Sequence, residues 1–341
     1  MLSINQKTTK LFYYWLVISF LLIFIMIIVG GLTRLTDSGL SITEWELFKG
    51  VMPPLSQDKW DEYFSLYKNI PQYQLINLDM TLSEFKIIFY WEYFHRILGR
   101  LIGLFFLISF IFFWFNGKIH KDYLKICGIV LVLIIFQGFI GWYMVQSGLI
   151  NKTTVSHYRL SMHLTLAFII ISIIFWNILN IKKNTLKIFF INKNKNYIFY
   201  FFILTIFIQI ILGAFVSGLD AGKIYQTWPL MNRTYFPDDV TINKFIDIIN
   251  FDNHSLVQFY HRNIGYLILV YTFFVGIFIL KNNISRLVNP FYLVLLFLIF
   301  QILLGIMTLI SGLNIYLASG HQIGSLLLIL SVINLYYHYI K

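Results

Sequence analysis

Long apolar segments alternate with shorter polar ones along the whole chain. Eight segments of about 20 residues or more are dominated by apolar side chains, at 12–32, 87–115, 123–146, 157–181, 197–218, 255–280, 288–311 and 315–339. A helix of about 20 apolar residues is long enough to cross the hydrocarbon layer of a bilayer. The pattern therefore predicts an all-α polytopic membrane protein with eight transmembrane helices.

The distribution of charge predicts the orientation of these helices. The chain has 341 residues, of which 58% are apolar and 12% charged, with a net charge of +11. If the N-terminus is cytoplasmic, the inner segments are rich in Lys and Arg with Asp122 as their only acid, and most carboxylates fall in the outer segments 33–86 and 219–254. This bias places both termini in the cytoplasm. The positive charge therefore reports topology and gives no support to nucleic-acid binding.

The first apolar segment is interpreted as an uncleaved span. It reaches Gly30 and Gly31 without a small-residue cleavage site, and no Arg-rich transit sequence precedes it. These features favour a bacterial inner membrane. The single cysteine, Cys127, excludes an intrachain disulfide.

The chain repeats itself near its midpoint. GGLTRLTDSGLSITEW at 30–45 aligns without gaps with GAFVSGLDAGKIYQTW at 213–228, at an offset of 183 residues. The second and sixth spans agree at an offset of 166, and the third and seventh agree at 164. We therefore expect two four-helix bundles in the same orientation, related as parallel repeats: residues 1–181, a cytoplasmic linker at 182–196, and residues 197–341.

Four histidines lie at matched depths in the even-numbered spans, two in each repeat. They are His95, His163, His261 and His321. Polar groups at membrane depth suggest function, and facing imidazoles on bundle helices are suited to ligating haem iron from both sides of the porphyrin. Topology places all four in the outer half of the membrane. The alternative is that they form hydrogen bonds between helices.

An arginine directly follows the histidine of the second and sixth spans. Arg96 and Arg262 could bind haem propionates, because a guanidinium binds planar carboxylates in a bidentate manner. Arg34 and Arg159 are weaker candidates of the same type. The alternatives are that these arginines extend toward the headgroups or pair with a nearby acid.

A carboxyl group lies near the histidine of the second span and has no acidic counterpart in the sixth span. Glu92 lies three positions before His95 and shares its helix face, whereas the matching residue before His261 is Gln258. This asymmetry suggests that one site reacts and the other carries electrons. We expect burial to favour the neutral form of Glu92, which would suit it to proton transfer or to stabilising a cation. The alternative is a structural hydrogen bond to a facing helix.

The whole chain resembles the haem A synthase family, related to mitochondrial Cox15 and bacterial CtaA proteins. The resemblance rests on GGLTRLTDSGLSITEW with KGVMPPL, and on EYFHRILGR, RLSMHL, QFYHRNIGY and GHQIGS, in the same order along the chain. The long segment PPLSQDKWDEYFSLYKNIPQY is similar to the mitochondrial and alphaproteobacterial branch. The chain lacks a cysteine pair that Gram-positive relatives carry in the first outer loop, so a redox role of such a pair is absent here.

The resemblance implies oxidation of the C8 methyl group of haem O to a formyl group through a hydroxymethyl intermediate, giving haem A for cytochrome oxidase. By this analogy His95 and His163 bind the substrate haem, with Glu92 as the catalytic residue. The second pair, His261 and His321, ligates the iron of a permanent haem B, and water supplies the oxygen while an external acceptor takes the electrons.

Two other functions use the same four histidines. A di-haem b-type electron carrier linked to quinone would hold two permanent haems, and a haem-handling protein would bind haem loosely. The pathway further implies haem O synthase and a cytochrome oxidase assembly factor as partners in the lipid membrane. Homo-oligomerisation is left open, and no nucleic acid is expected.

Overall fold

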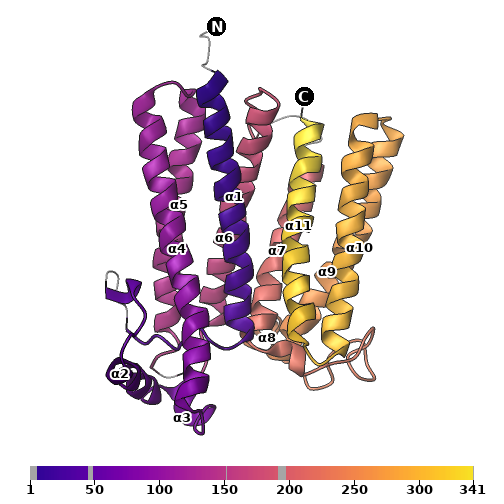
Figure 1. Ribbon diagram of the computed structural model, residues 1–341. Coiled ribbons are helices and arrows are strands. Elements are labelled where there is room, and N and C mark those ends of the chain that lie inside the picture. The colour runs from indigo at the N-terminus through magenta and orange to yellow at the C-terminus, as the bar shows by residue number, and fades with distance from the viewer. Residues whose placement is uncertain (1–5, 45–48, 151, 191–196, 341) are drawn as a thin grey trace. The chain divides into compact units, whose positions relative to one another are not determined.

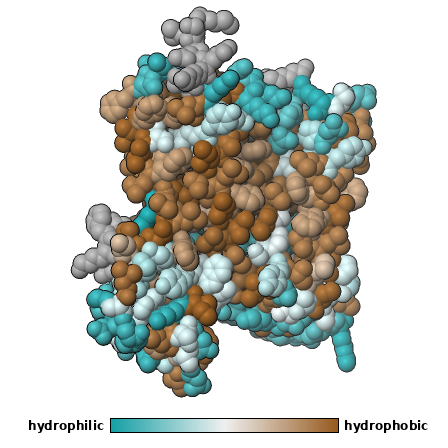
Figure 2. Space-filling view, viewed as in Figure 1, coloured by the Kyte–Doolittle hydropathy of each residue, from teal (hydrophilic) through white to brown (hydrophobic). Residues whose placement is uncertain are grey.

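The computed structural model describes residues 6–44, 49–150, 152–190 and 197–340, and helices dominate them (Figure 1). Within these residues eight helices are long and apolar enough to cross a membrane, which confirms the predicted fold class and all eight predicted segments. Figure 2 shows hydrophobic residues gathered along the middle of the helices and hydrophilic residues toward their ends.

The membrane-spanning helices are α1 (Gln6–Leu35), α4 (Leu82–Asn116), α5 (Lys121–Gln146), α6 (His157–Lys182), α7 (Tyr197–Gly218), α9 (His254–Lys281), α10 (Val288–Ile310) and α11 (Ile315–Tyr339). Three short helices lie in the connections, namely α2 (Gln57–Lys68), α3 (Pro71–Leu75) and α8 (Phe245–Ile248). Three 3₁₀ turns, Lys49–Val51, Ala221–Lys223 and Ser285–Leu287, complete the described elements.

Local sequence signals set several helix ends. Thr81 caps α4 in a reciprocal capping box with Glu84, and Gly117 ends the same helix with a φ of 65°. Asn253 and Asn314 accept backbone N–H bonds at the starts of α9 and α11.

Asp37 and Asp220, which are aligned in the internal repeat, follow the first helix of each repeat with φ values of 50° and 52°. Trp45, the last residue of the first repeated motif, lies outside the described residues.

The chain forms two compact units, Met1–Asn177 and Ile178–Lys341. In the first unit α1 contacts α4 and α4 contacts α5. Gln137 of α5 bonds to α6 at the carbonyl of His163, and Phe175 of α6 packs on Phe20 of α1 at 5.8 Å between ring centroids. The order around this bundle is therefore α1, α4, α5 and α6, so that α4 and α6 lie across from each other.

The second unit has the same order of helices. Contacts join α7 to α9, α9 to α10, α10 to α11 and α11 back to α7, so α9 and α11 lie across this bundle from each other. The predicted linker 182–196 contributes its first residues to this unit. Lys187 accepts a bond from Asn180 and donates to the carbonyl of Tyr337 at 3.0 Å. Residues 191–196 of that linker lie outside the described residues.

The long segments 36–81 and 219–253 leave the same end of their respective bundles, which we call the long-loop end. In the first unit α4 continues beyond the predicted segment 87–115 and has 35 residues, about 52 Å, which is more than a bilayer core requires. The amphipathic helix α2 packs against the extra turns of α4, where Trp60 and Phe64 contact Phe85 and Phe89. This packing holds α2 at the long-loop end of its bundle (Figure 1).

Candidate functional site

The first unit brings His95 and His163 together in its centre. His95 comes from α4 and His163 from α6, and their ring centroids lie 6.5 Å apart with 69° between the ring planes. Both side chains are half-buried. Two helices that face each other across the bundle therefore each contribute one imidazole to a shared space.

The second unit repeats this arrangement. His261 of α9 and His321 of α11 place their ring centroids 6.3 Å apart, with 81° between the planes. Two imidazoles that bind one metal ion from opposite sides, each at about 2 Å, put their centroids about 6 Å apart. The separation in both units fits two ligands to a single iron atom.

A glycine of a neighbouring helix lies against each of the four imidazoles. A Cβ atom added to Gly30 would lie 3.1 Å from His95 Nε2, and one added to Gly141 would lie 3.0 Å from His163 Cε1. In the second unit, Cβ atoms on Gly213 and Gly305 would lie 3.1 Å and 2.8 Å from Cε1 of His261 and His321, respectively. These glycines come from the two helices that carry no histidine of the pair. Each bundle therefore has histidines on one diagonal and glycines on the other.

Glutamines of the neighbouring helices contact three of the histidines. Gln137 donates to the carbonyl of His163 at 3.0 Å, and Gln209 donates to the carbonyl of His261 at 2.9 Å. Gln301 Nε2 lies 3.4 Å from His321 Nε2, while Nδ1 of His321 lies 3.1 Å from the Gln301 carbonyl. At the offset of 183 residues, the residue that corresponds to Gln209 is Met26. The sequence alignment of the repeats therefore gave no signal for this glutamine.

Several buried polar atoms at these sites have no hydrogen-bond partner among the described residues. They are Nδ1 of His163 and His261 and Oε1 of Gln137, Gln209 and Gln301. Buried polar atoms in proteins are normally satisfied, and exceptions often mark a ligand or functional site. These unpaired atoms, the glycines packed against the imidazoles and the separations between the rings together show that the residues present fit a porphyrin iron in each unit.

Glu92 is buried beside the first histidine pair and fully engaged. Its Oε1 atom accepts bonds from Arg96 at 3.0 Å and 2.6 Å, and its Oε2 atom accepts from Ser41 at 2.8 Å and the backbone N–H of Ile42 at 2.9 Å. We expected burial to favour a neutral carboxyl group here. Four donor groups, two of them from the Arg96 guanidinium, surround this carboxyl group.

The corresponding residues of the second unit form a related but reversed contact. Gln258 donates to the carbonyl of Tyr225 at 2.9 Å, and Arg262 donates to the same carbonyl at 3.0 Å. Arg96 likewise donates to the carbonyl of Ile42 at 2.9 Å, and Ile42 corresponds to Tyr225 at the offset of 183. Both arginines therefore anchor the start of a long loop, an alternative to the propionate role suggested by the sequence.

Two further histidines lie at helix starts of the long-loop end. His157 opens α6 and is buried against the ring of Tyr158, and His254 opens α9 and is exposed. Ser41 and the N–H of Ile42 could not be identified as partners of Glu92 from the sequence, because their contact with Glu92 depends on the conformation of the chain after α1.

Comparisons with known proteins cover nearly the full chain. A family model described as COX15-CtaA, cytochrome oxidase assembly protein, matches residues 13–333. A protein named Heme A synthase from Pelagibacter ubique is 49% identical over 320 residues, covering 93% of each chain. Proteins of the same name from Flavobacterium psychrophilum and Rickettsia prowazekii are 40% and 39% identical, with 93% and 95% of this chain and 94% and 96% of theirs covered.

Proposed function

Because the chain belongs to the COX15-CtaA family of cytochrome oxidase assembly proteins, we propose that it is a haem A synthase. In this proposal it oxidises the C8 methyl group of haem O to a formyl group through a hydroxymethyl intermediate. The observation that carries the proposal is the duplicated imidazole pair with a carboxyl group beside only one of the two copies. Glu92 stands beside one pair, and Gln258 stands at the same position beside the other.

The two pairs have different tasks in this proposal. His95 and His163 bind the iron of the substrate, haem O. His261 and His321 bind haem B, which supplies one-electron transfer when it is bound. The ring separations of 6.5 Å and 6.3 Å support one shared iron in each unit.

Glu92 acts on the substrate side through its fixed negative charge. Conversion of the methyl group to hydroxymethyl removes two electrons and two protons in total, and water supplies the oxygen. The electrons leave to an external acceptor. Arg96, Ser41 and the N–H of Ile42 hold the carboxylate in place, so that it stabilises positive charge that develops at the carbon and accepts a released proton.

We place the protein in the bacterial inner membrane with both termini in the cytoplasm. The long-loop ends, and with them the histidine pairs, then face the periplasmic side. The excess of Lys and Arg in the opposite segments supports this orientation. The pathway then calls for haem O synthase as supplier and a cytochrome oxidase assembly factor as recipient.

Haem extraction from the purified protein followed by mass analysis tests the proposal. Haem O, its hydroxylated form or haem A alongside haem B is the expected result. Haem B alone at two per chain would instead identify a di-haem electron carrier. Loss of all haem during purification, with no oxidised product, would favour a haem-handling role.

A further inference from the structure

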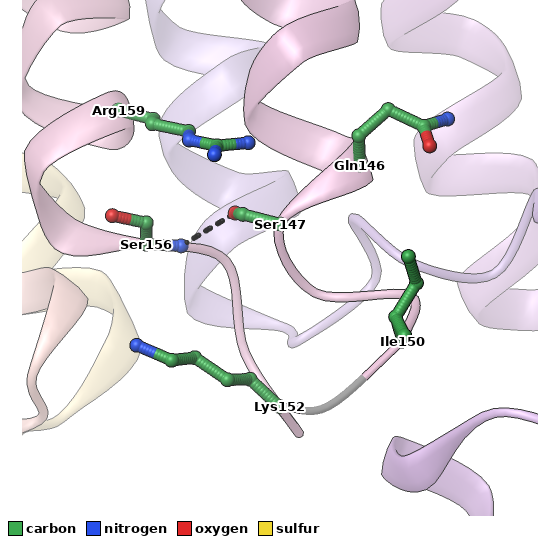
Figure 3. Close-up of a pocket in the computed structure, with 6 residues that line it drawn as sticks. All are labelled: Gln146, Ser147, Ile150, Lys152, Ser156 and Arg159. Atoms are coloured by element: carbon green, nitrogen blue, oxygen red, sulfur yellow. Dashed lines mark hydrogen bonds between the residues drawn. The ribbon is translucent and has the colours of Figure 1, made fainter.

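A cavity of about 300 Å³ opens at the long-loop end of the first unit, between the end of α5 and the start of α6 (Figure 3). Six residues line it: Gln146, Ser147, Ile150, Lys152, Ser156 and Arg159. Two of the six are cations and none is acidic. The cavity therefore favours an anionic group.

The guanidinium of Arg159 is held in a fixed plane. It stacks over the ring of Tyr143, with 3.6 Å from its carbon to the ring centroid, and Nη1 donates to the Tyr143 carbonyl at 2.6 Å. Figure 3 shows the guanidinium extending from α6 into the space between the two helix ends. A guanidinium held in this way loses little entropy when its other N–H groups bind a carboxylate.

The cavity lies next to the first histidine pair. Arg159 precedes His163 by one turn of α6, so both side chains lie on the same helix face, separated by about 6 Å along the axis. On the neighbouring helix α5, Gly141 contacts His163, and Tyr143, two residues further toward the long-loop end, contacts Arg159. Arg159, which lines the cavity, therefore lies one helical turn from the imidazole of His163 on the side of the long-loop end.

The second unit has a shorter connection at the corresponding place. The connection from α5 to α6 has ten residues, 147–156, whereas the connection from α10 to α11 has four, 311–314. Four residues before His321, in the position that Arg159 has relative to His163, stands Leu317. The additional residues and the arginine thus belong to the first histidine pair alone.

We propose that Arg159 and Lys152 bind a carboxylate of the tetrapyrrole held by His95 and His163. The proposal rests on the assignment of this pair as the substrate haem site. A substrate must be captured and released in every cycle, whereas a permanent haem need not be. A water-facing cation at the mouth of the site increases the capture rate of an anionic ligand, and Lys152 is exposed to solvent.

Haemin and its dimethyl ester, which lacks free carboxylates, distinguish this role from a structural one. Each would be titrated into the purified full-length protein in neutral detergent. The measured signal is the absorption change that His163→Ala abolishes.

Arg159→Leu introduces the residue found in the second unit and should weaken haemin binding about tenfold or more. Lys152→Gln should weaken it several-fold and reduce its salt dependence. Arg159→Lys should retain part of the affinity, and all variants should bind the ester as the unaltered protein does.

An equal loss of affinity for haemin and ester in Arg159→Leu would show that the arginine only supports the fold, and would overturn the proposal. Unchanged haemin binding would also overturn it. A loss of haemin affinity in Arg159→Leu that appears only when phosphatidylglycerol is added would overturn the proposal as well. In that case the cavity would bind a lipid headgroup. If the unaltered protein shows no binding of either probe that depends on His163, the assignment of the substrate site itself fails, and this proposal falls with it.

Discussion

Glu92 and Arg96 form a largely buried ion pair one turn apart on α4, with 2.6 Å between Glu92 Oε1 and Arg96 Nη2. Removing two charges from water is costly, so buried ion pairs often contribute little net stability compared with apolar residues of similar size. The second unit shows that the fold accommodates an amide at this position, because Gln258 donates there to the carbonyl of Tyr225. A carboxylate in the first unit alone is therefore better explained by chemistry than by stability.

Replacement of Glu92 by glutamine should stop oxidation without removing haem. The amide is nearly the same size and can donate as Gln258 does, but it carries no charge and cannot accept a proton at neutral pH. We expect haem A output to fall about 100-fold or more, with accumulation of haem O or its hydroxylated form. Haem extraction and mass analysis of cells that express the variant measure this. Unchanged haem A output would remove Glu92 from the chemistry.

The reciprocal substitution, Gln258→Glu, is the matched control. Arg262 Nε has no hydrogen-bond partner among the described residues, and in the first unit the same atom of Arg96 donates to Glu92. A carboxylate introduced at position 258 would therefore meet a guanidinium. We expect haem A output close to that of the unaltered protein. A loss as large as that of Glu92→Gln would show that both positions matter only for folding.

Substitutions at the two histidine pairs should have different effects on the absorption spectrum of the purified protein. His261→Ala and His321→Ala each remove one of two axial ligands from the proposed permanent haem, so the b-type absorption of the purified protein should disappear or become that of a weakly bound, five-coordinate haem. His95→Ala and His163→Ala should retain that absorption and lose haem A output. Retention of an unaltered b-type spectrum in His261→Ala would reverse or refute the assignment.

The positions of the helices and histidines could be predicted from sequence because both depend on local pattern. Apolar runs define the spans, and His95 or His321 stands out as a polar residue inside one. The contact between Glu92 and Arg96 was also accessible, since residues four apart share a helix face. From the sequence, pairing of Arg96 with a nearby acid is one alternative, and a hydrogen bond from Glu92 to a facing helix is another, but neither joins these two residues to each other.

Other features depend on which helix faces meet, and a single sequence does not specify this. The contact of Gly141 with His163 requires the rotation of α5 against α6 to be known. The bond from the N–H of Ile42 to Glu92 depends on the fold of a loop that has no apolar period of its own. The start of α4 at Leu82 was missed because its first turn is polar and projects beyond the apolar segment.

Two glycines on α5 test whether close contact between α5 and His163 matters for binding. A Cβ atom on Gly141 would lie 3.0 Å from His163 Cε1, which is tighter than ordinary contacts, whereas one on Gly138 would meet no atom within 4 Å. Gly141→Ala should displace the imidazole and weaken haemin binding at this pair about tenfold, measured by titration. Gly138→Ala should bind haemin normally and be as stable as the unaltered protein or slightly more stable, because alanine favours the helix. If both variants bind haemin equally well, the close contact between Gly141 and this imidazole does not contribute to binding.

The second long loop should respond to pH through Tyr225 and Asp239. The Tyr225 hydroxyl lies beside the carboxylates of Asp238 and Asp239, at 2.7 Å from the latter, and Ser255 donates to Asp239 at 2.7 Å. Burial and these carboxylates raise the pKa of Tyr225. Burial acts to raise the pKa of Asp239, but the hydrogen bonds from Ser255 and Tyr225 outweigh it and lower that pKa.

The direction of each shift gives the pH range in which the cluster stabilises the fold. Stability from Asp239 is present above its unfolded pKa, near 3.8, and is lost as pH falls through the folded value. Stability from Tyr225 is present below its ordinary pKa of 10.0 and is lost as pH rises through its raised value. Because the carbonyl of Tyr225 anchors Arg262 next to His261, loosening of this loop should release the proposed haem B.

The temperature at which half of the b-type absorption is lost, measured from pH 3 to 8, reports this coupling. Asp239→Asn should lower that temperature at neutral pH, and the difference from the unaltered protein should shrink as the pH falls below 3.8 and the carboxyl group of Asp239 becomes protonated. Asp247→Asn is the matched control. Asp247 lies in the same loop but accepts bonds from the N–H groups of Asn243 and Lys244 instead of Tyr225, so it should leave haem retention nearly unchanged. A difference for Asp239→Asn that is constant across this pH range would show that its charge does not stabilise the loop.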